Sequence, residues 1–236
     1  MLGWLALIRM AGPSSAGAAM VMPSMTHWHA AELAALVAMW ATMMVAMMLP
    51  SAAPVILLFA GTMRRRSARR EPAVPTAVFL LGYLLVWTGF SVLAGSAEWA
   101  LHGAALVSPA TMRAVPPLAG VLLVAAGVFQ WTPLKRACLA HCRSPLHFLS
   151  TGWREGASGA LAMGMRHGLY CVGCCWLVMG LLFVAGVMNL AWVAVLAAFV
   201  LVEKVAPAGD AVGRAAGVLL VGWGGWLLLA SAAVSA

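Results

Sequence analysis

Charged residues are scarce in this sequence of 236 residues, since Asp, Glu, Lys and Arg together make up 8% of it. A soluble domain carries roughly 25% charged residues and about 45–50% apolar ones. Here 64% of the residues are hydrophobic and the mean hydropathy is +0.98. This composition excludes a water-soluble globular enzyme. The length allows instead about six membrane helices of roughly 20 residues each, and leaves no room for a large extramembrane catalytic domain.

Recognisable catalytic motifs are absent as well. The sequence contains no Ser/His/Asp grouping, no H-E-x-x-H motif, no P-loop and no Rossmann glycine pattern, so we predict that the protein is not an enzyme. Acidic residues are almost absent from the apolar runs, which argues against a proton-coupled transporter. The net charge of +8 arises mostly between those runs, and no RNA-binding signature accompanies it, so we expect no nucleic-acid partner.

The apolar runs predict the fold. The first complete run, residues 33–60, contains no charged residue and is longer than a bilayer core of about 30 Å requires, so it should tilt or kink, with Pro50 and Pro54 offering the kink. The other runs lie at about 76–97, 115–131, 168–187, 190–205 and 213–233. We therefore predict an all-α, polytopic transmembrane helical bundle in the lipid bilayer, with about six spans and a partial N-terminal helix. Glycines in the last run suit close helix packing: Gly213, Gly217, Gly222, Gly224 and Gly225.

Basic residues define the expected topology. The densest charge cluster, Arg64-Arg65-Arg66-Ser67-Ala68-Arg69-Arg70, directly follows the first complete run. The polar stretch 132–167 carries five basic residues and one acid. Positively charged loops remain in the cytoplasm, so we place the basic loops 61–75 and 132–167 on the cytoplasmic side.

The N-terminus departs from this regular pattern. Residues 1–12 are apolar but too short to span a bilayer, Arg9 interrupts them, and Pro13 follows. Because no basic segment precedes them as it would in a signal peptide, we expect the tail of a first helix whose beginning lies upstream of the assigned start. We divide the chain into residues 1–32, with the apolar N-terminus and an outer Met/His segment, and residues 33–236, a single transmembrane helical domain with a cytoplasmic Cys-containing loop at 132–167.

Sulfur is plentiful, with 16 Met and 5 Cys, and the first cluster of it lies in the outer segment AMVMPSMTHWH. Thioether and imidazole suit copper, and a thioether needs no deprotonation, so it can bind in an oxidising compartment. We consider these residues a candidate outer copper site: Met20, Met22, Met25, His27 and His29. The alternative is an interfacial segment whose Trp28 and Met side chains merely contact lipid headgroups.

A methionine stripe continues from that segment into the first complete run. Met39, Met43 and Met47 fall on one helix face, with Met44 and Met48 beside them. The stripe is a candidate ladder of thioethers for Cu(I). Methionine also fills irregular cores, so packing of a bundle seam is the alternative.

The strongest candidate site combines cysteines from two segments. His167, Cys171, Cys174 and Cys175 share one face of a helix, and the adjoining loop holds Cys138, His141 and Cys142, with Cys138 and Cys142 one turn apart if that loop is helical. All five thiols lie on the expected reducing side, which argues against structural disulfides. We expect a thiolate site for Cu(I), with Zn(II) as the close competitor and a [2Fe–2S] cluster less suited to this spacing. Buried cysteines that only pack, or a C-x-x-C redox pair at Cys171 and Cys174, are the alternatives.

Two further pairs carry weaker signals. Glu98 and His102 are one turn apart at the outer end of the second run and are candidates for an extra outer ligand pair, although such residues are more often solvated at the interface. Glu203 and Lys204 close the fifth run, where we expect a local ion pair.

Several motifs together resemble one known family. They are MWATMMVAMMLPSAAPVILLFA (39–60), YLLVWTGFS (83–91), FQWTPLKRACLAHCRSPLHF (129–148), RHGLYCVGCCWLVMGLLFVAGVMNL (166–190) and the Glu203-Lys204 pair. They resemble a bacterial family described as predicted metal-binding integral membrane proteins, associated with copper chaperones that supply tyrosinase-type copper oxidases. The resemblance covers nearly everything from about residue 28 onward. It implies copper handling, with the Met-rich helix and the Cys segments as family features.

These observations lead to one expected function and three alternatives. We expect a protein of the bacterial inner membrane that binds Cu(I) and delivers it to a client copper oxidase or cupredoxin. The alternatives are a small metal permease or exporter, a membrane thiol-disulfide oxidoreductase, and a purely structural membrane subunit.

Overall fold

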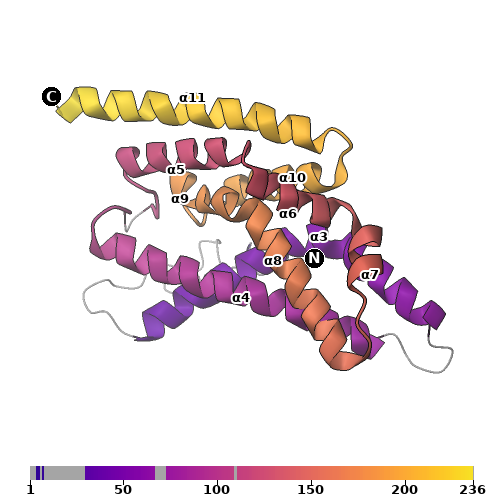
Figure 1. Cartoon of the computed structure of the whole chain (residues 1–236). Coiled ribbons are helices and arrows are strands. Elements are labelled where there is room, and N and C mark those ends of the chain that lie inside the picture. Colours follow the sequence, from indigo (N-terminus) through magenta and orange to yellow (C-terminus); the bar gives the residue numbers. More distant parts are fainter. Residues whose placement is uncertain (1–3, 6, 8–29, 67–72, 109–110, 236) are drawn as a thin grey trace.

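The protein is helical almost throughout the part that the computed structural model describes, residues 4–5, 7, 30–66, 73–108 and 111–235, and no β-strand occurs there. This confirms the all-α class. The helices, shown in Figure 1, are α3 (Ala30–Arg66), α4 (Ala73–Gly103), α5 (Pro116–Phe129), α6 (Pro133–Arg143), α7 (Pro145–Gly152), α8 (Gly156–Gly180), α9 (Leu182–Ala185), α10 (Leu190–Val205) and α11 (Gly209–Ser235).

Four stretches of helix in the described ranges are long and apolar enough to cross a membrane: Ala31–Arg65, Ala73–Gly103, Gly156–Ala185 and Gly209–Ala233. Helices α5 and α6 are bent by 65° at their junction and make a fifth span if they cross as one unit. Helix α10 has 16 residues, so at about 1.5 Å per residue it is shorter than the hydrocarbon core. Each of the six expected runs forms a helix, and the structure supports four to five spans.

Helix α8 begins at Gly156, well before the expected start of its span at residue 168. The stretch 132–167, expected to be a loop, therefore contains α6, α7 and the first turns of α8. Helix α6 begins as its sequence favours, because Pro133 occupies the first helical turn and the Thr132 hydroxyl accepts a hydrogen bond from the Lys135 amide. Both cysteines of this stretch thus lie on a helix, as the spacing of one turn required.

Close backbone contact holds α4 against α8. A Cβ atom on Gly164 would lie 1.9 Å from the Phe79 carbonyl oxygen, and one on Gly82 would lie 2.3 Å from that of Leu161. Only glycine permits this approach, which is typical of helices packed in lipid. The crossing brings the middle of α8 onto the buried face of α4.

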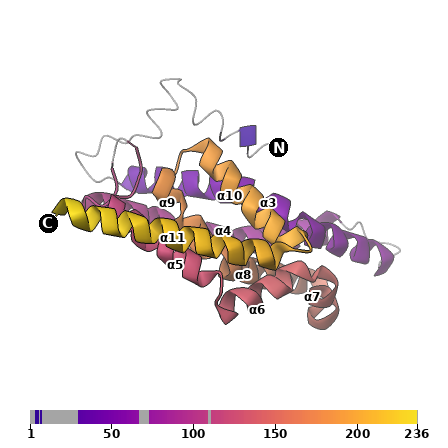
Figure 2. The same cartoon turned by 90° about the horizontal axis from the view of Figure 1, so that it is seen from above.

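Helices α5 and α11 form a second close pair, antiparallel at the top of Figure 1 and again side by side in Figure 2. Gly217 and Gly224 of α11 lie against the carbonyls of Gly127 and Gly120, as the prediction of glycine-mediated packing required, whereas Gly222 and Gly225 face open space. The opposite face of α11 exposes large apolar side chains: Val218, Leu219, Trp226 and Leu229. An exposed apolar face of this kind suits contact with lipid.

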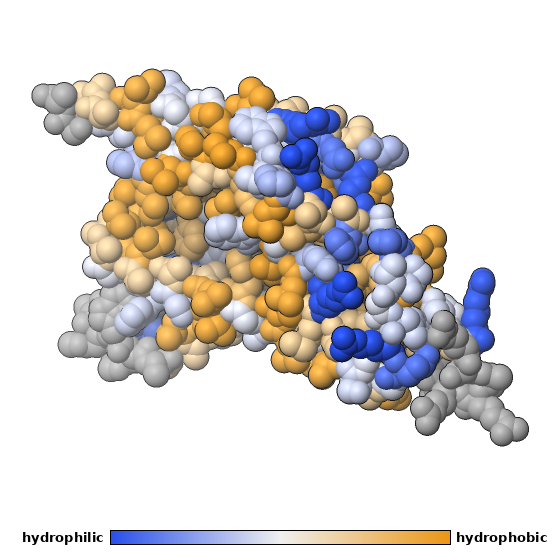
Figure 3. Space-filling model, in the orientation of Figure 1, coloured by the Kyte–Doolittle hydropathy of each residue, from blue (hydrophilic) through white to orange (hydrophobic). Residues whose placement is uncertain are grey.

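Helices α3 and α4 run antiparallel with a defined register. Val37 of α3 contacts Gly95 of α4, and farther along the pair the Tyr83 hydroxyl donates a hydrogen bond to the Met48 carbonyl. Helix α3 continues through Pro50 and Pro54. In Figure 3 the hydrophilic residues gather at the end of the molecule that carries α6, α7 and the start of α11, and orange apolar surface covers most of the other end.

Candidate metal centre

Three of the five cysteines lie together in the middle of α8. Cys171, Cys174 and Cys175 are all at most 1% exposed, and they share one helix face as predicted. The thiols of Cys174 and Cys175 both donate hydrogen bonds to the Cys171 carbonyl oxygen, over 3.1 and 2.9 Å. The Cys175 thiol is also within hydrogen-bonding reach of the thiols of Cys171 and Cys174. The predicted face of α8 is therefore a continuous group of sulfur atoms.

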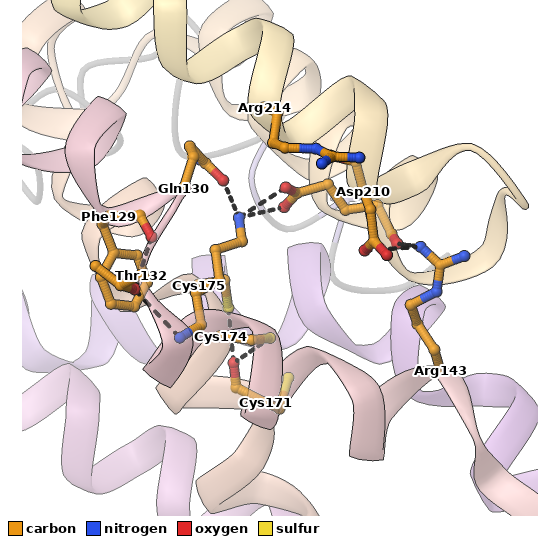
Figure 4. Close-up of polar contacts among 11 residues, drawn as sticks. Phe129, Gln130, Thr132, Arg143, Cys171, Cys174, Cys175, Asp210 and Arg214 are labelled. Atoms are coloured by element: carbon orange, nitrogen blue, oxygen red, sulfur yellow. Dashed lines mark hydrogen bonds and ion pairs between the residues drawn. The ribbon is translucent and has the colours of Figure 1, made fainter.

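Helix α6 adds its two cysteines to this group. The buried Cys142 thiol is within hydrogen-bonding reach of the Cys174 thiol. The half-buried Cys138 lies against Gly173, where an added Cβ would be 2.7 Å from the Cys138 sulfur. Figure 4 shows Cys171, Cys174 and Cys175 on their helix, next to the polar contacts of the surrounding helices. Two segments that are separate in the sequence thus place their thiols at one interface.

A buried positive charge lies beside Cys171. The Lys204 ammonium of α10 lies 2.9 Å from the Cys171 sulfur and donates to the Ser51 hydroxyl over 3.1 Å. The Tyr83 hydroxyl lies 3.2 Å from the same sulfur. Sequence reasoning missed Lys204 as a partner of the site. A lysine inside an apolar run was the available signal, because a buried ammonium requires a partner.

Glu203 has a different partner, and the expected local ion pair with Lys204 is wrong. Both Glu203 carboxylate oxygens accept from the Lys135 ammonium of α6, over 2.7 and 2.8 Å, and Gln130 completes the contact. Figure 4 shows this contact as dashed lines between the helices. Successive residues of a helix point in directions about 100° apart, so Glu203 and Lys204 reach different neighbours. Glu203 thereby fixes α6, which carries two of the five thiols, to α10.

A second contact holds the other end of α6. The Arg143 guanidinium donates to the carbonyl oxygens of Glu203, Ala206 and Pro207, and pairs with Asp210 over 3.3 Å. The carbonyls at the end of a helix lack partners within the helix, so an arginine satisfies them well. Helix α6 is therefore anchored at both ends.

The two predicted histidines occupy different environments. His167 is 2% exposed, packs against the rings of Phe79, Tyr83 and Phe148, and its Nδ1 has no hydrogen-bond partner in the described part of the chain. His141 is half-buried and stacks on Tyr170, with ring centroids 4.0 Å apart. Its Nδ1 lies 2.9 Å from the Ala137 carbonyl, so the tautomer that donates there leaves Nε2 available as a ligand.

The predicted methionine stripe is buried. Met39, Met43 and Met47 are at most 6% exposed, and they belong to the same core as Cys171. Met44 and Met48 are fully buried beside them. Helix α3 therefore places the stripe between its N-terminal end and the thiols, which is compatible with both transfer of metal and simple packing.

Some predicted ligands lie outside the described residues, namely Met20, Met22, Met25, His27 and His29. Within the ranges that are described, no three His, Cys, Asp or Glu side chains converge as a ready ligand set for a metal ion. The thiols of Cys142, Cys174, Cys175 and Cys171 follow one another as neighbours across the interface of α6 and α8. As thiolate ligands of a metal ion, Cys174 and Cys175 would give up their hydrogen bonds to the Cys171 carbonyl oxygen.

Glu98 and His102, the candidate extra ligand pair, are buried, with exposed fractions of 0 and 8%, so the alternative that they are solvated at the interface is wrong. Helix α4 extends to Gly103 and keeps both residues on its buried face. The Trp40 indole of α3 donates to Glu98 Oε2. Hydropathy alone placed the two residues at the interface because they end an apolar run.

Comparison with known proteins agrees with the resemblance in the sequence. A family model with the description "PpoB2: Copper chaperone" matches residues 37–227, which include α4 to α10 and the five cysteines. No curated protein and no solved structure matches the chain.

Proposed function

Because the chain belongs to the PpoB2 copper chaperone family, we propose that it is a membrane protein that binds Cu(I) on its buried thiols and delivers it to a client copper enzyme. The single observation that carries this proposal is that α6 and α8 place their cysteines at one interface, where Cys138 lies against Gly173 and the buried Cys142 is near Cys174. The alternative of cysteines that only pack explains a lone thiol, but it explains poorly a series contributed by two helices.

The chemistry of the donors favours Cu(I). Thiolate and thioether are soft ligands that select Cu(I), and a pair of thiolates is a sufficient ligand set for this ion. The described thiols lie near one another in pairs, Cys142 with Cys174 and Cys171 with Cys175. Zn(II), which prefers four ligands in a tetrahedron, is the competitor at these thiols.

The position of each thiol suggests a route. Cys138 and His141 are half-buried on α6, Cys142 is 8% exposed, and Cys171 is fully buried. We place the exchange of copper with the aqueous phase at Cys138 and His141, and its storage at Cys142, Cys174, Cys175 and Cys171. The methionine stripe of α3 supplies a second route, from the thiols toward the outer end of α3. A client such as a copper oxidase or cupredoxin would receive the metal.

The charge of the site supports a resident monovalent ion. Lys204 places a positive charge beside Cys171, so a thiolate there is neutralised without metal. When two thiolates hold Cu(I), the lysine balances the remaining negative charge. For the membrane orientation we retain the bacterial inner membrane, with the basic segments 61–75 and 132–167 at the cytoplasmic side.

A competition titration tests the proposal. Purified protein in detergent should bind at least one Cu(I) per chain against a colorimetric chelator under anaerobic conditions. The triple variant Cys171→Ser, Cys174→Ser, Cys175→Ser should lose this binding, while His147→Gln, which alters an exposed histidine of α7, should retain it. Equal binding by the triple variant and the unaltered protein would overturn the thiol site. Electron transfer to quinone with a Cys171–Cys174 disulfide would support an oxidoreductase instead.

A further inference from the structure

A second group of metal-binding side chains is buried far from the thiols. Glu98 and His102 lie on the buried face of α4, about 22 Å along the helix from Tyr83, which contacts Cys171. They are at the end of α4 opposite the arginine-rich segment that precedes Ala73. Both side chains are more than nine-tenths buried.

The two side chains lack the partners that buried polar groups normally have. Within the described residues, Glu98 Oε1 and both ring nitrogens of His102 have no hydrogen-bond partner. Buried polar atoms are satisfied in the great majority of cases, because leaving one unsatisfied costs about 1–3 kcal/mol. An unsatisfied carboxylate oxygen beside an unsatisfied imidazole therefore requires an explanation in terms of a bound group.

The distance between the two side chains fits a metal ion better than a hydrogen bond. His102 Nε2 and Glu98 Oε1 are 3.9 Å apart, whereas a hydrogen bond between N and O spans about 2.7–3.2 Å. Imidazole nitrogen and carboxylate oxygen bind transition metals at about 2.0–2.2 Å. An ion placed between the two atoms can therefore bind both of them with a bent nitrogen–metal–oxygen angle. An ion of this kind would span the 3.9 Å without movement of the helix.

The other carboxylate oxygen is held in place. Trp40 of α3 donates its indole N–H to Glu98 Oε2, which fixes the carboxylate and directs Oε1 toward His102. Ligating carboxylates characteristically have such an outer partner, and it tunes the affinity of the site. Trp40 is itself fully buried and is one turn from Met43 of the stripe.

We propose that Glu98 and His102 bind a divalent transition-metal ion of the Cu²⁺ or Zn²⁺ type, as a second site distinct from the thiols. Nitrogen and oxygen donors suit divalent ions, whereas the sulfur donors of α6 and α8 suit Cu(I). Trp40 is a positioning residue for Glu98. The site does not depend on the thiol site, so it stands whether or not the proposed delivery of Cu(I) is correct.

The test uses Cu²⁺ as a probe in a background where the thiols cannot reduce or bind it. The full chain with Cys138, Cys142, Cys171, Cys174 and Cys175 all changed to Ser is titrated with Cu²⁺ and followed by electron paramagnetic resonance. We expect one equivalent with a nitrogen hyperfine signature. Glu98→Gln and His102→Gln should each weaken binding by more than the roughly 10–100-fold that loss of an outer partner costs, and Trp40→Phe should weaken it by about that range.

Controls separate this proposal from loss of folding and from the proposed function. His147→Gln should bind Cu²⁺ like the parent, because it alters an exposed histidine on another helix. In the chain with its cysteines restored, Glu98→Gln and His102→Gln should bind Cu(I) at the thiols normally, which also shows that they fold. Cu²⁺ binding that is unaffected by Glu98→Gln and His102→Gln, or no stoichiometric binding in the parent, would overturn the second site.

Discussion

Glu203 and Glu98 are both almost inaccessible to solvent, but their surroundings differ. The comparison separates an acid that supports the fold from an acid that is available to a ligand. Glu203 has both carboxylate oxygens on the Lys135 ammonium. Glu98 has one oxygen on the Trp40 indole, and within the described residues the other has no hydrogen-bond partner. Glu203 is 2% exposed and Glu98 is 0% exposed, so the two acids are equally buried. The number of hydrogen-bond partners therefore distinguishes their roles.

The two acids also mark different ligand chemistries. Near Glu203 and its neighbour Lys204 lie the thiols of α6 and α8, which are soft donors. Near Glu98 lies an imidazole, and the pair offers nitrogen and oxygen. The methionines of α3 occupy the interval between the two ends. Sulfur donors thus lie at one end of the α3–α4 pair, and nitrogen and oxygen donors lie at the other.

The largest expected effect comes from breaking the Glu203 contact. Glu203→Leu leaves the Lys135 ammonium buried without its counter-charge, which should cost about 3–5 kcal/mol of the free energy of unfolding. Glu98→Leu removes an acceptor from the Trp40 indole and leaves no ammonium behind, so its cost should stay near about 1–3 kcal/mol. Denaturant or thermal unfolding in one detergent measures both.

A double variant makes the Glu203 comparison sharper. In Lys135→Met with Glu203→Leu both charges are gone, so part of the stability lost in Glu203→Leu should return. If Glu203→Leu and Glu98→Leu destabilise the protein equally, the distinction between a supporting acid and an available acid is wrong.

The sequence predicted the positions of the thiols far better than the partners of the charged residues beside them, for a physical reason. The positions of Cys171, Cys174 and Cys175 on one face follow from helical periodicity within a single segment, and so does the turn that separates Cys138 from Cys142. The partners of Glu203 and Lys204 depend on where α10 packs against α6 and α3. No local pattern encodes that packing.

The extent of α8 was underestimated for a related reason. The small residues of its first turns, GASGALAMGM, are followed by Arg166 and His167, and a search for apolar runs begins only after this polar pair. The smallness of the first residues is what lets Gly164 lie against the Phe79 carbonyl. Because α8 begins at Gly156, the thiols lie in the middle of the candidate span instead of near the end that was predicted to face the cytoplasm.

A smaller effect is expected where α6 and α8 meet at the thiols. Gly173→Ala places a Cβ 2.7 Å from the Cys138 sulfur, which must move away. We expect Cu(I) affinity to fall about three- to tenfold, which corresponds to roughly 0.7–1.4 kcal/mol. Gly180→Ala is the matched control, because a Cβ there meets nothing within 4 Å.

The mechanism of the Gly173 effect can be tested by its dependence on Cys138. If the alanine acts by displacing that thiol, then adding Gly173→Ala to Cys138→Ser should change the affinity little further, since changes at contacting residues are not additive. Fully additive losses would mean that Gly173 acts on α8 itself.

The smallest expected effect on Cu(I) affinity is at His141, which lies half-buried on α6 near the thiols. His141→Phe preserves the stack on Tyr170 but removes the nitrogen that could receive or release copper. Because the buried thiols set the equilibrium, the Cu(I) dissociation constant should change less than about threefold, or roughly 0.7 kcal/mol. The rate of Cu(I) exchange with a soluble chelator should nevertheless fall several-fold in stopped-flow measurements.

Equal slowing of both binding and release would leave the equilibrium unchanged, which is the signature of a residue on the route. A large loss of affinity without slower exchange would instead make His141 a ligand of the stored ion, and the surface exchange point would have to lie at Cys138 alone.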